Sequence, residues 1–328
     1  LPLRAEWPSS AVAGMPAVLA GCLAERRRLL LAAWSLLASA PALLLLLRAP
    51  VARDARPAGA GPVALAAGEG RGRPGSGTFL HLSDFHLDPF YDPAIGSGCF
   101  CNHYAIQSAW CERHHRCSLH RCQGSGTGNI FGQRNCDLPR AAMHATLRAA
   151  AAQAPRGGYD WILVTGDFTR HQVERLGRPD HKAFVRGVMM EVTQAIHQYF
   201  PNTTVHHNRQ PELYTLGNED FSADYDNGDY IASGQQGANP WFTSLEFFVH
   251  PQPYEATQEH TTFAQGGYFM QRLSDCLYLV SLNTIIYASK HHWSGPVPRD
   301  PLGQFQWLRG VLGWLRGLRR SPGPGPKA

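Results

Sequence analysis

The stretch FLHLSDFHLDP, residues 79–89, decides the fold that this sequence predicts. It begins as a short apolar strand and runs directly into Asp84 and His86. Residues two apart on an extended chain point to the same side, so these side chains can offer an oxygen and a nitrogen to one metal ion. A lone D-x-H pattern is common by chance, and other stretches must support it.

Two later stretches repeat this arrangement. WILVTGD, residues 161–167, is an apolar run that ends in glycine and Asp167, and LYTLGNED, residues 213–220, runs into glycine and Asn218. Taken singly, Asp167 and Asn218 are ordinary turn residues. In an α/β fold the carboxyl ends of strands gather the binding residues, so three such ends in succession predict a metal centre.

The order D-x-H, G-D and G-N-x-D at these spacings resembles the calcineurin-like metallophosphoesterases. Further motifs resemble the acid sphingomyelinase-like phosphodiesterases and the endopolyphosphatases within that family. These motifs are Asp88-Pro89, C-D-x-P at 136–139, T-G-D-x-x-R-H at 165–171, S-L-N-T at 281–284 and Q-F-Q-W-L at 304–308. The resemblance runs from about Thr78 to Leu312 and implies an α/β fold, a two-sheet sandwich flanked by helices.

The family carries later G-H-x-P-P and G-H-x-H motifs that supply further histidine ligands. Neither follows Leu318, and His291 and His292 lack the glycine context. The resemblance therefore implies that the fold is incomplete at its C-terminus. The alternative to an enzyme is a catalytically inactive fragment, or a binding or scaffold protein that retains only the first half of the metal site.

The resemblance implies a hydrolase of phosphodiester or phosphoanhydride bonds with two divalent metal ions, which could be zinc, manganese or iron. Asp84 and His86 would bind the first ion, Asp167 would bridge the pair, and Asn218 would bind the second. Metal-bound hydroxide would attack the phosphorus of a phosphoester or polyphosphate substrate.

Two more residues are expected to act in catalysis. His171 occupies a position where both related families carry a histidine, beside the metals or the substrate phosphate, although a loop histidine is the alternative. Glu219 stands where most of the superfamily has the histidine that protonates the leaving oxygen. An alkoxide needs that proton more than a departing phosphate does, so Glu219 favours polyphosphate unless burial raises its pKa enough for it to act as the acid.

Composition allows one sizeable core and gives no sign of a nucleic-acid partner. The chain has 328 residues, of which 44 % are hydrophobic, and a formal net charge of +5. Within it, no run of Lys and Arg alternates with aromatic residues, as a nucleic-acid surface would require.

The N-terminal part predicts targeting. Arginines at 26–28 precede Leu29–Leu47, a run without charge, which indicates a signal anchor with residues 1–28 cytoplasmic; a cleaved signal peptide is the alternative. The sequence predicts a disordered linker over residues 48–77, the phosphoesterase domain over residues 78–318 and a disordered tail over residues 319–328. We therefore expect the domain in a lumenal, vacuolar–lysosomal or extracellular space, anchored to the membrane or secreted.

An insert at 99–136 holds six of the eight cysteines, namely Cys99, Cys101, Cys111, Cys117, Cys122 and Cys136. Their spacing matches no regular zinc framework, and an oxidising compartment favours disulfides over the alternative zinc module. The connectivity stays open, although the resemblance implies that Cys136 ties the insert to the next helix. Asn202 begins an N-T-T glycosylation acceptor, which is either used or unused.

Hydrophobic periodicity predicts the remaining elements. Asp137, with Pro139 two residues on, predicts the N-cap of a helix that continues to about residue 152. Apolar residues at helical spacing predict helices over 184–200 and 305–318, with Phe305, Leu308, Val311, Leu312 and Leu315 on the packed face of the second. Alternation over 267–273 and 276–284 predicts a hairpin.

Overall fold

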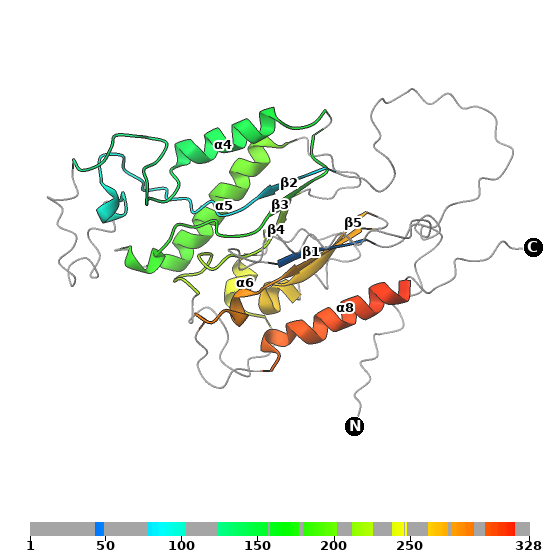
Figure 1. Ribbon diagram of the computed structural model, residues 1–328. Coiled ribbons are helices and arrows are strands. Elements are labelled where there is room, and N and C mark those ends of the chain that lie inside the picture. Colours follow the sequence, from blue (N-terminus) through cyan, green and yellow to red (C-terminus); the bar gives the residue numbers. More distant parts are fainter. Residues whose placement is uncertain are drawn as a thin grey trace, which may run out of the picture.

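The computed structural model describes residues 43–48, 78–102, 124–156, 158–176, 180–201, 212–225, 238–245, 247, 262–274, 277–291 and 299–318. Within these ranges the chain forms four layers (Figure 1). Two helices cover a first sheet, a second sheet lies beneath it, and one long helix covers the second sheet from outside. Helices and strands are mixed, as the predicted α/β class requires.

The first sheet is parallel and carries the three predicted donor-bearing strands. β2 (Phe79–Leu82), β3 (Trp161–Val164) and β4 (Glu212–Tyr214) lie in the order β2-β3-β4. β3 is the central strand and pairs in parallel with both neighbours. All three strands therefore end at the same edge of the sheet, which confirms the predicted convergence.

The second sheet is antiparallel, with β6 (Leu277–Leu282) between β5 (Phe269–Ser274) and β1 (Leu43–Arg48). β5 and β6 confirm the predicted hairpin. β1 differs from the prediction of a membrane anchor over Leu29–Leu47, because its leucines are extended and pair with β6 instead of continuing a helix. An apolar run without periodicity suits a strand as well as a helix, and the edge of β6 offers it backbone partners.

The other N-terminal predictions lie outside the described residues, which exclude 1–42 and 49–77. Among the residues that are described, no helix has both the length and the apolar character needed to cross a membrane. Asn202 and the tail at 319–328 also lie outside the described ranges.

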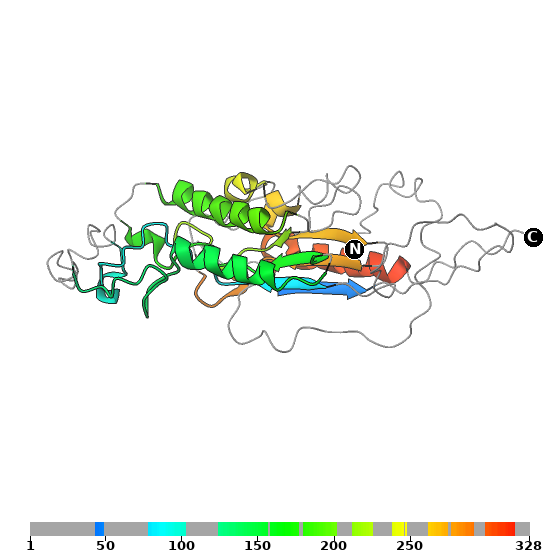
Figure 2. The same ribbon diagram turned by 90° about the horizontal axis from the view of Figure 1, so that it is seen from above.

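Helices α4 (Arg140–Ala152) and α5 (His181–Tyr199) lie together over the parallel sheet (Figures 1 and 2). α5 begins at Asp180, whose side chain accepts the backbone N–H of Ala183 at 2.9 Å. The apolar residues of α5 recur at helical spacing and are buried. α4 begins later than predicted and has no side-chain cap, so the assignment of Asp137 as its N-cap is wrong.

Helix α8 (Gln304–Leu318) covers the antiparallel sheet, and α6 (Pro240–Ser244) is a short helix. Val311 of α8 packs with Val280 and Leu282 of β6. Phe305 and Leu312 are 48 % and 43 % exposed, so only part of the predicted packed face of α8 is buried. Short 3-10 turns lie at Ser97–Cys99, Val173–Arg175, Ile285–Tyr287 and Pro301–Gly303.

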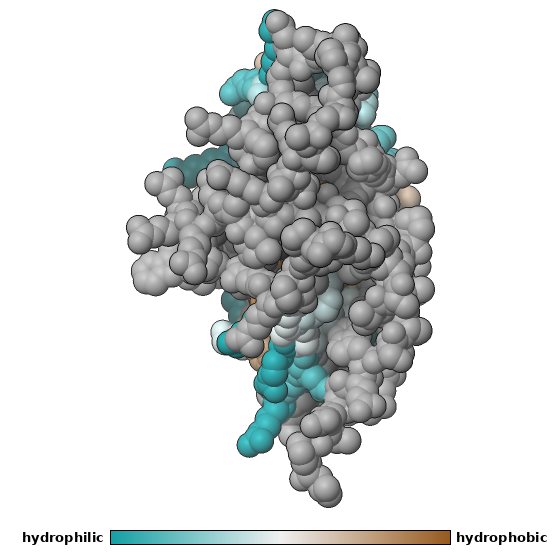
Figure 3. All heavy atoms as spheres, turned by 90° about the vertical axis from the view of Figure 1, so that its right-hand side faces the viewer, coloured by the Kyte–Doolittle hydropathy of each residue, from teal (hydrophilic) through white to brown (hydrophobic). Residues whose placement is uncertain are grey.

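One large core joins the two sheets. It contains Ile162 and Leu213 from the parallel sheet together with Phe269 and Leu279 from the antiparallel sheet. Burial of these apolar side chains is what holds the layers face to face. On the face drawn in Figure 3, the visible described residues are mainly hydrophilic, as expected when the apolar residues collect inside.

The cysteine-rich insert is tied to the domain by a disulfide. Cys101 and Cys136 are bonded across 35 residues of sequence, and Cys99 is also in a disulfide. These findings confirm disulfides over a zinc module for the described cysteines. Cys111, Cys117 and Cys122 lie outside the described residues.

Candidate metal centre

Three predicted ligands converge where β2 and β3 end. Nε2 of His86 lies 3.8 Å from Oδ1 of Asp84 and 3.9 Å from Oδ2 of Asp167. One donor atom from each residue falls within 4.8 Å of the others. Ligand atoms bound to one ion at about 2.0–2.2 Å lie roughly 3–4 Å apart. The donors therefore fit a divalent ion after small movements.

The His86 ring is held in the orientation that a ligand needs. Its Nδ1 lies 3.1 Å from the backbone carbonyl oxygen of Thr169, which can only accept, so Nδ1 carries the proton. In the neutral ring the lone pair is then on Nε2, which faces the two carboxylates. This is the usual way in which an outer hydrogen bond fixes a metal-binding histidine.

The backbone is strained at these residues. Asp84, His86 and Asp167 have φ of 54°, 41° and 54°, in the left-handed region that residues other than glycine rarely adopt. Such conformations cost on the order of 1 kcal/mol each and concentrate at functional sites. The N–H of His86 donates to the carbonyl oxygen of Asp167 at 2.8 Å, which holds the two loops together.

Two glycines allow the loops after β3 and β4 to touch. A Cβ on Gly217 would lie 2.1 Å from Oδ1 of Asp167, and a Cβ on Gly166, which has φ of 90°, would lie 2.2 Å from the Gly217 nitrogen. Both distances are far below van der Waals contact. The glycine before each candidate ligand is therefore needed for backbone approach, not only for the turn.

Asp220, which sequence reasoning did not single out, ties these loops together. Its Oδ2 accepts the N–H groups of Gly217 at 2.7 Å and Asp167 at 2.9 Å. Its Oδ1 accepts those of Phe168 at 2.8 Å and Thr169 at 3.3 Å. The side chain is fully buried. The final residue of G-N-x-D was the only sequence signal for this role.

Hydrogen bonds of its amide nitrogen orient the side chain of Asn218. Nδ2 donates to Oδ1 of Asp224 at 2.8 Å and lies 3.4 Å from Oε1 of Glu219. An amide whose nitrogen is engaged on one side presents its carbonyl oxygen on the other. The N–H of the next residue, Glu219, donates to Oδ1 of Asp167 at 3.0 Å, so this loop adjoins the predicted bridging carboxylate.

Glu219 has the raised pKa that it needs in order to act as an acid. The residue is 3 % exposed, and burial, with the nearby Asp224 carboxylate, raises its pKa to about 8. Its Oε2 has no hydrogen-bond partner among the described residues. At neutral pH the side chain therefore holds a proton that it can donate.

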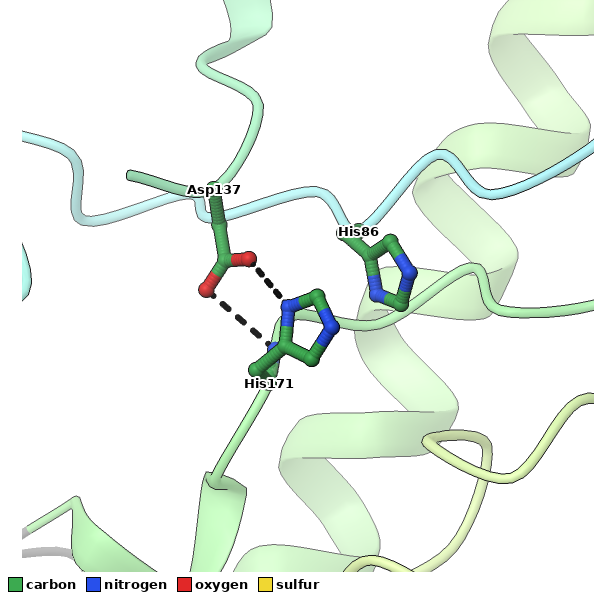
Figure 4. Close-up of side chains that lie close together, drawn as sticks. All are labelled: His86, Asp137 and His171. Atoms are coloured by element: carbon green, nitrogen blue, oxygen red, sulfur yellow. Dashed lines mark hydrogen bonds and ion pairs between the residues drawn. The ribbon is translucent and has the colours of Figure 1, made fainter. Parts of the chain in front are cut away.

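His171 lies against His86 (Figure 4). The two rings stack with centroids 3.8 Å apart and planes 20° from parallel. Nδ1 of His171 lies 2.6 Å from Oδ1 of Asp137, and this hydrogen bond raises the pKa of the imidazole. His171 thus lies beside the candidate ligand His86, whereas Asp137, predicted as a helix cap, is its hydrogen-bond partner.

A cavity of about 360 Å³ opens over these residues. Its lining includes Asp84, His86, Asp137 and His171, with Gln133 from the insert. A larger cavity of about 610 Å³ lies along α8 and contains none of the candidate ligands. The smaller cavity is therefore the one that adjoins the candidate ligands.

Comparison with known proteins agrees with this geometry. The family model described as calcineurin-like phosphoesterase matches residues 77–322. The match covers most of the sequence, including every candidate ligand, and the chain belongs to the calcineurin-like phosphoesterase family.

Several curated proteins are similar to the chain. An endopolyphosphatase of Neurospora crassa is 26 % identical over 73 % of this chain and 30 % of its own length. The acid sphingomyelinase-like phosphodiesterase 3b of Mus musculus is 27 % identical, over 72 % of this chain and 44 % of its own length. A cyclic GMP-AMP phosphodiesterase of Bos taurus is 28 % identical, over 73 % and 45 %. The chain spans less than half the length of these relatives.

Proposed function

We infer that the protein is a two-metal hydrolase of phosphodiester or phosphoanhydride bonds. Asp84 and His86 would hold the first ion, Asp167 would be shared by the pair, and Asn218 would bind the second through its amide oxygen. The observation that carries this proposal is the convergence of the Asp84, His86 and Asp167 donors within 4.8 Å at the ends of two parallel strands.

Divalent ions at this place would supply an activated water nucleophile and compensate the charge of the phosphoryl oxygens. The donor set contains carboxylates and imidazole, which suits zinc, manganese or iron. Burial raises the pKa of Asp167, because the protein alone compensates its charge incompletely. A cation at the centre would restore the ionised form of this carboxylate.

The groups beside the metal ligands have separate roles in this proposal. His171 faces the cavity over the ligands, where its exposed ring can contact a phosphoryl oxygen. Glu219 donates a proton to the leaving oxygen, the role for which most of the family uses a histidine. Its position next to Asn218 and its retained proton support this assignment.

The relatives named above suggest polyphosphate, sphingomyelin-like lipids or cyclic dinucleotides as substrate classes. All share a phosphorus centre with an anionic oxygen, and they differ in the basicity of the leaving group. The disulfide between Cys101 and Cys136 supports a lumenal, vacuolar–lysosomal or extracellular setting.

The experiment that tests the proposal measures hydrolysis of bis(p-nitrophenyl) phosphate and of polyphosphate by the full chain with added manganese or zinc. We expect turnover that is lost on chelation and falls by at least about 100-fold in Asp167→Asn. Asp92→Asn, a change at a partly exposed loop carboxylate that accepts the N–H of Ala94, is the control. Equal rates in wild type and Asp167→Asn, or no turnover in either, would contradict the proposal.

Leaving-group dependence tests the role of Glu219. Replacing Glu219 by His should raise activity on phosphodiesters with poor leaving groups and change activity on polyphosphate or aryl esters much less. Glu219→Gln, which cannot donate a carboxyl proton, should show the opposite trend. Effects that are equal across leaving groups in both variants would exclude Glu219 from proton transfer.

A further inference from the structure

Asp137 makes two hydrogen bonds to one residue of the candidate site. Its Oδ1 accepts from Nδ1 of His171 at 2.6 Å, and its Oδ2 accepts from the His171 backbone N–H at 3.2 Å (Figure 4). A carboxylate only accepts, so the ring proton sits on Nδ1. Nε2 is then the only ring nitrogen of His171 that remains for a ligand in the cavity.

The ring of His171 has little freedom once these bonds form. One face stacks on His86, at 3.8 Å between centroids, and the Asp137 contacts fix its rotation about the side-chain axis. His171 still keeps 52 % of its side-chain surface exposed, toward the cavity that also contains Asp84. The imidazole is therefore held in one orientation and is accessible from the cavity.

Asp137 is itself held in place from behind. Arg170 is 1 % exposed, and its Nε lies 3.6 Å from Oδ2 of Asp137 while its Nη1 lies 3.3 Å from Oδ2 of Asp88. Asn102 donates to both oxygens of Asp88 at 2.9 Å. A buried arginine thus joins the two carboxylates, and neither can turn without breaking an ion pair.

The backbone around Asp137 is also anchored. Its neighbour Cys136 is in the disulfide with Cys101. Its other neighbour, Leu138, donates its N–H to the carbonyl oxygen of His86 at 3.0 Å and accepts the N–H of Asp88 at 2.9 Å. The segment that directly follows the insert is therefore bonded to the loop that carries the candidate ligand His86.

We propose that Asp137 is a positioning residue: it sets the tautomer and orientation of His171 so that Nε2 faces the substrate phosphate. This proposal rests on the proposed function, because the orientation of Nε2 matters for catalysis only if the protein is a phosphoester hydrolase. His86, Asp137 and His171 could also be considered ligands of one ion. Oδ1 of Asp137 and Nδ1 of His171 are 2.6 Å apart, closer than the roughly 3 Å of two ligands sharing an ion, which favours the hydrogen bond.

Kinetics of the full chain test the coupling. We expect Asp137→Asn to lower kcat by about 30-fold or more with KM changed by less than about threefold, and to leave bound manganese unchanged. In the His171→Ala background, Asp137→Asn should cause no further loss, because the group that it orients is gone. Independent, multiplicative losses, or a loss of bound manganese in Asp137→Asn, would overturn the proposal.

Asp92→Asn provides the control. Asp92 accepts the N–H of Ala94 and makes none of the contacts to Arg170, Asp137 or His171 described above, so Asp92→Asn should leave kcat unchanged in the wild type and in the His171→Ala background. Circular dichroism and the melting temperature verify that each variant is folded. A loss of kcat in Asp92→Asn that disappears in the His171→Ala background would show that the coupling is not particular to Asp137, and the proposal would fail.

A measurement that needs no turnover separates this proposal from the proposed function. Histidine-selective ¹⁵N NMR, at a pH where imidazoles are neutral, reads the tautomer of His171, assigned by its disappearance in His171→Ala. We expect Nδ1–H in the wild type and a shift toward Nε2–H in Asp137→Asn. An Nε2–H tautomer in the wild type overturns the proposal even if the protein is an active hydrolase, whereas absence of Asp167-dependent turnover overturns only the proposed function.

Discussion

Asn218 and Asn283 both follow a strand, yet they lie in different kinds of sheet and make different contacts. After β6 of the antiparallel sheet, Asn283 is completely buried, its Nδ2 donates to Gly266 at 3.0 Å, and its Oδ1 accepts from Ile285 at 3.2 Å. After β4 of the parallel sheet, Asn218 commits its Nδ2 to Asp224 and lies beside the candidate ligands.

Topology explains the difference. Neighbouring strands of the parallel sheet end at the same edge, so the candidate ligands after β2 and β3 meet and the loop after β4 adjoins them. Neighbouring strands of the antiparallel sheet end at opposite edges, and the residue after β6 meets loops that use it for packing. The same residue type therefore serves the site in one sheet and the fold in the other.

The largest difference in stability between variants of the two sheets is expected from a change at Asp220. Asp220→Ala removes the acceptor of four buried N–H groups, from Gly217, Asp167, Phe168 and Thr169, and should lower the free energy of unfolding by about 4 kcal/mol. The matched variant Asp300→Ala removes the cap of α8 on the other sheet and should cost about 1 kcal/mol. Urea unfolding measures both, and equal losses would show that the loops of the parallel sheet are not specially organised.

The next effect concerns the disulfide that braces the parallel half. Cys101→Ser with Cys136→Ser should lower the free energy of unfolding by about 3 kcal/mol, because the link closes a loop of 35 residues in the unfolded chain. Reductant should abolish the difference in stability between wild type and double variant, because both then lack this link. Wild type and double variant of equal stability under oxidising conditions would contradict a structural role for the link.

A smaller effect should appear in the pH dependence of stability. The folded pKa of Glu219, about 8, exceeds its ordinary value of 4.5. Between these values the unfolded state releases the proton and the folded state keeps it, so stability falls as pH rises through this range. In metal-free protein we expect Glu219→Gln to flatten the pH profile of stability over this range. Parallel pH profiles of the two proteins would mean that Glu219 ionises normally when folded.

The parallel half of the fold could be predicted from the sequence because its signals are local. Each strand is a short apolar run followed by a ligand-type residue, which a glycine precedes after β3 and β4, and parallel order brings such ends together. The same logic placed Asp84, His86 and Asp167 around one point, where the structure has them. His171 was expected beside them, and it stacks on His86.

Other features depend on contacts that no local pattern records. Asp137 has the sequence signature of a helix N-cap, and only the fold shows that its carboxylate reaches across to His171. Leu43–Arg48 carries no periodicity, so the choice between strand and helix falls to the open edge of β6. Phe305 and Leu312 have helical spacing, but α8 rests on its sheet along a narrower stripe than that spacing suggests.

The most direct test of the account is to measure manganese binding by the full chain with isothermal titration calorimetry. Asp84, His86 and Asp167 are proposed as ligands, so Asp167→Asn should weaken binding by about 100-fold or more, while Asp92→Asn should bind like the wild type. That result would establish the metal centre at the ends of β2 and β3. Equal manganese affinity in wild type and Asp167→Asn would contradict it.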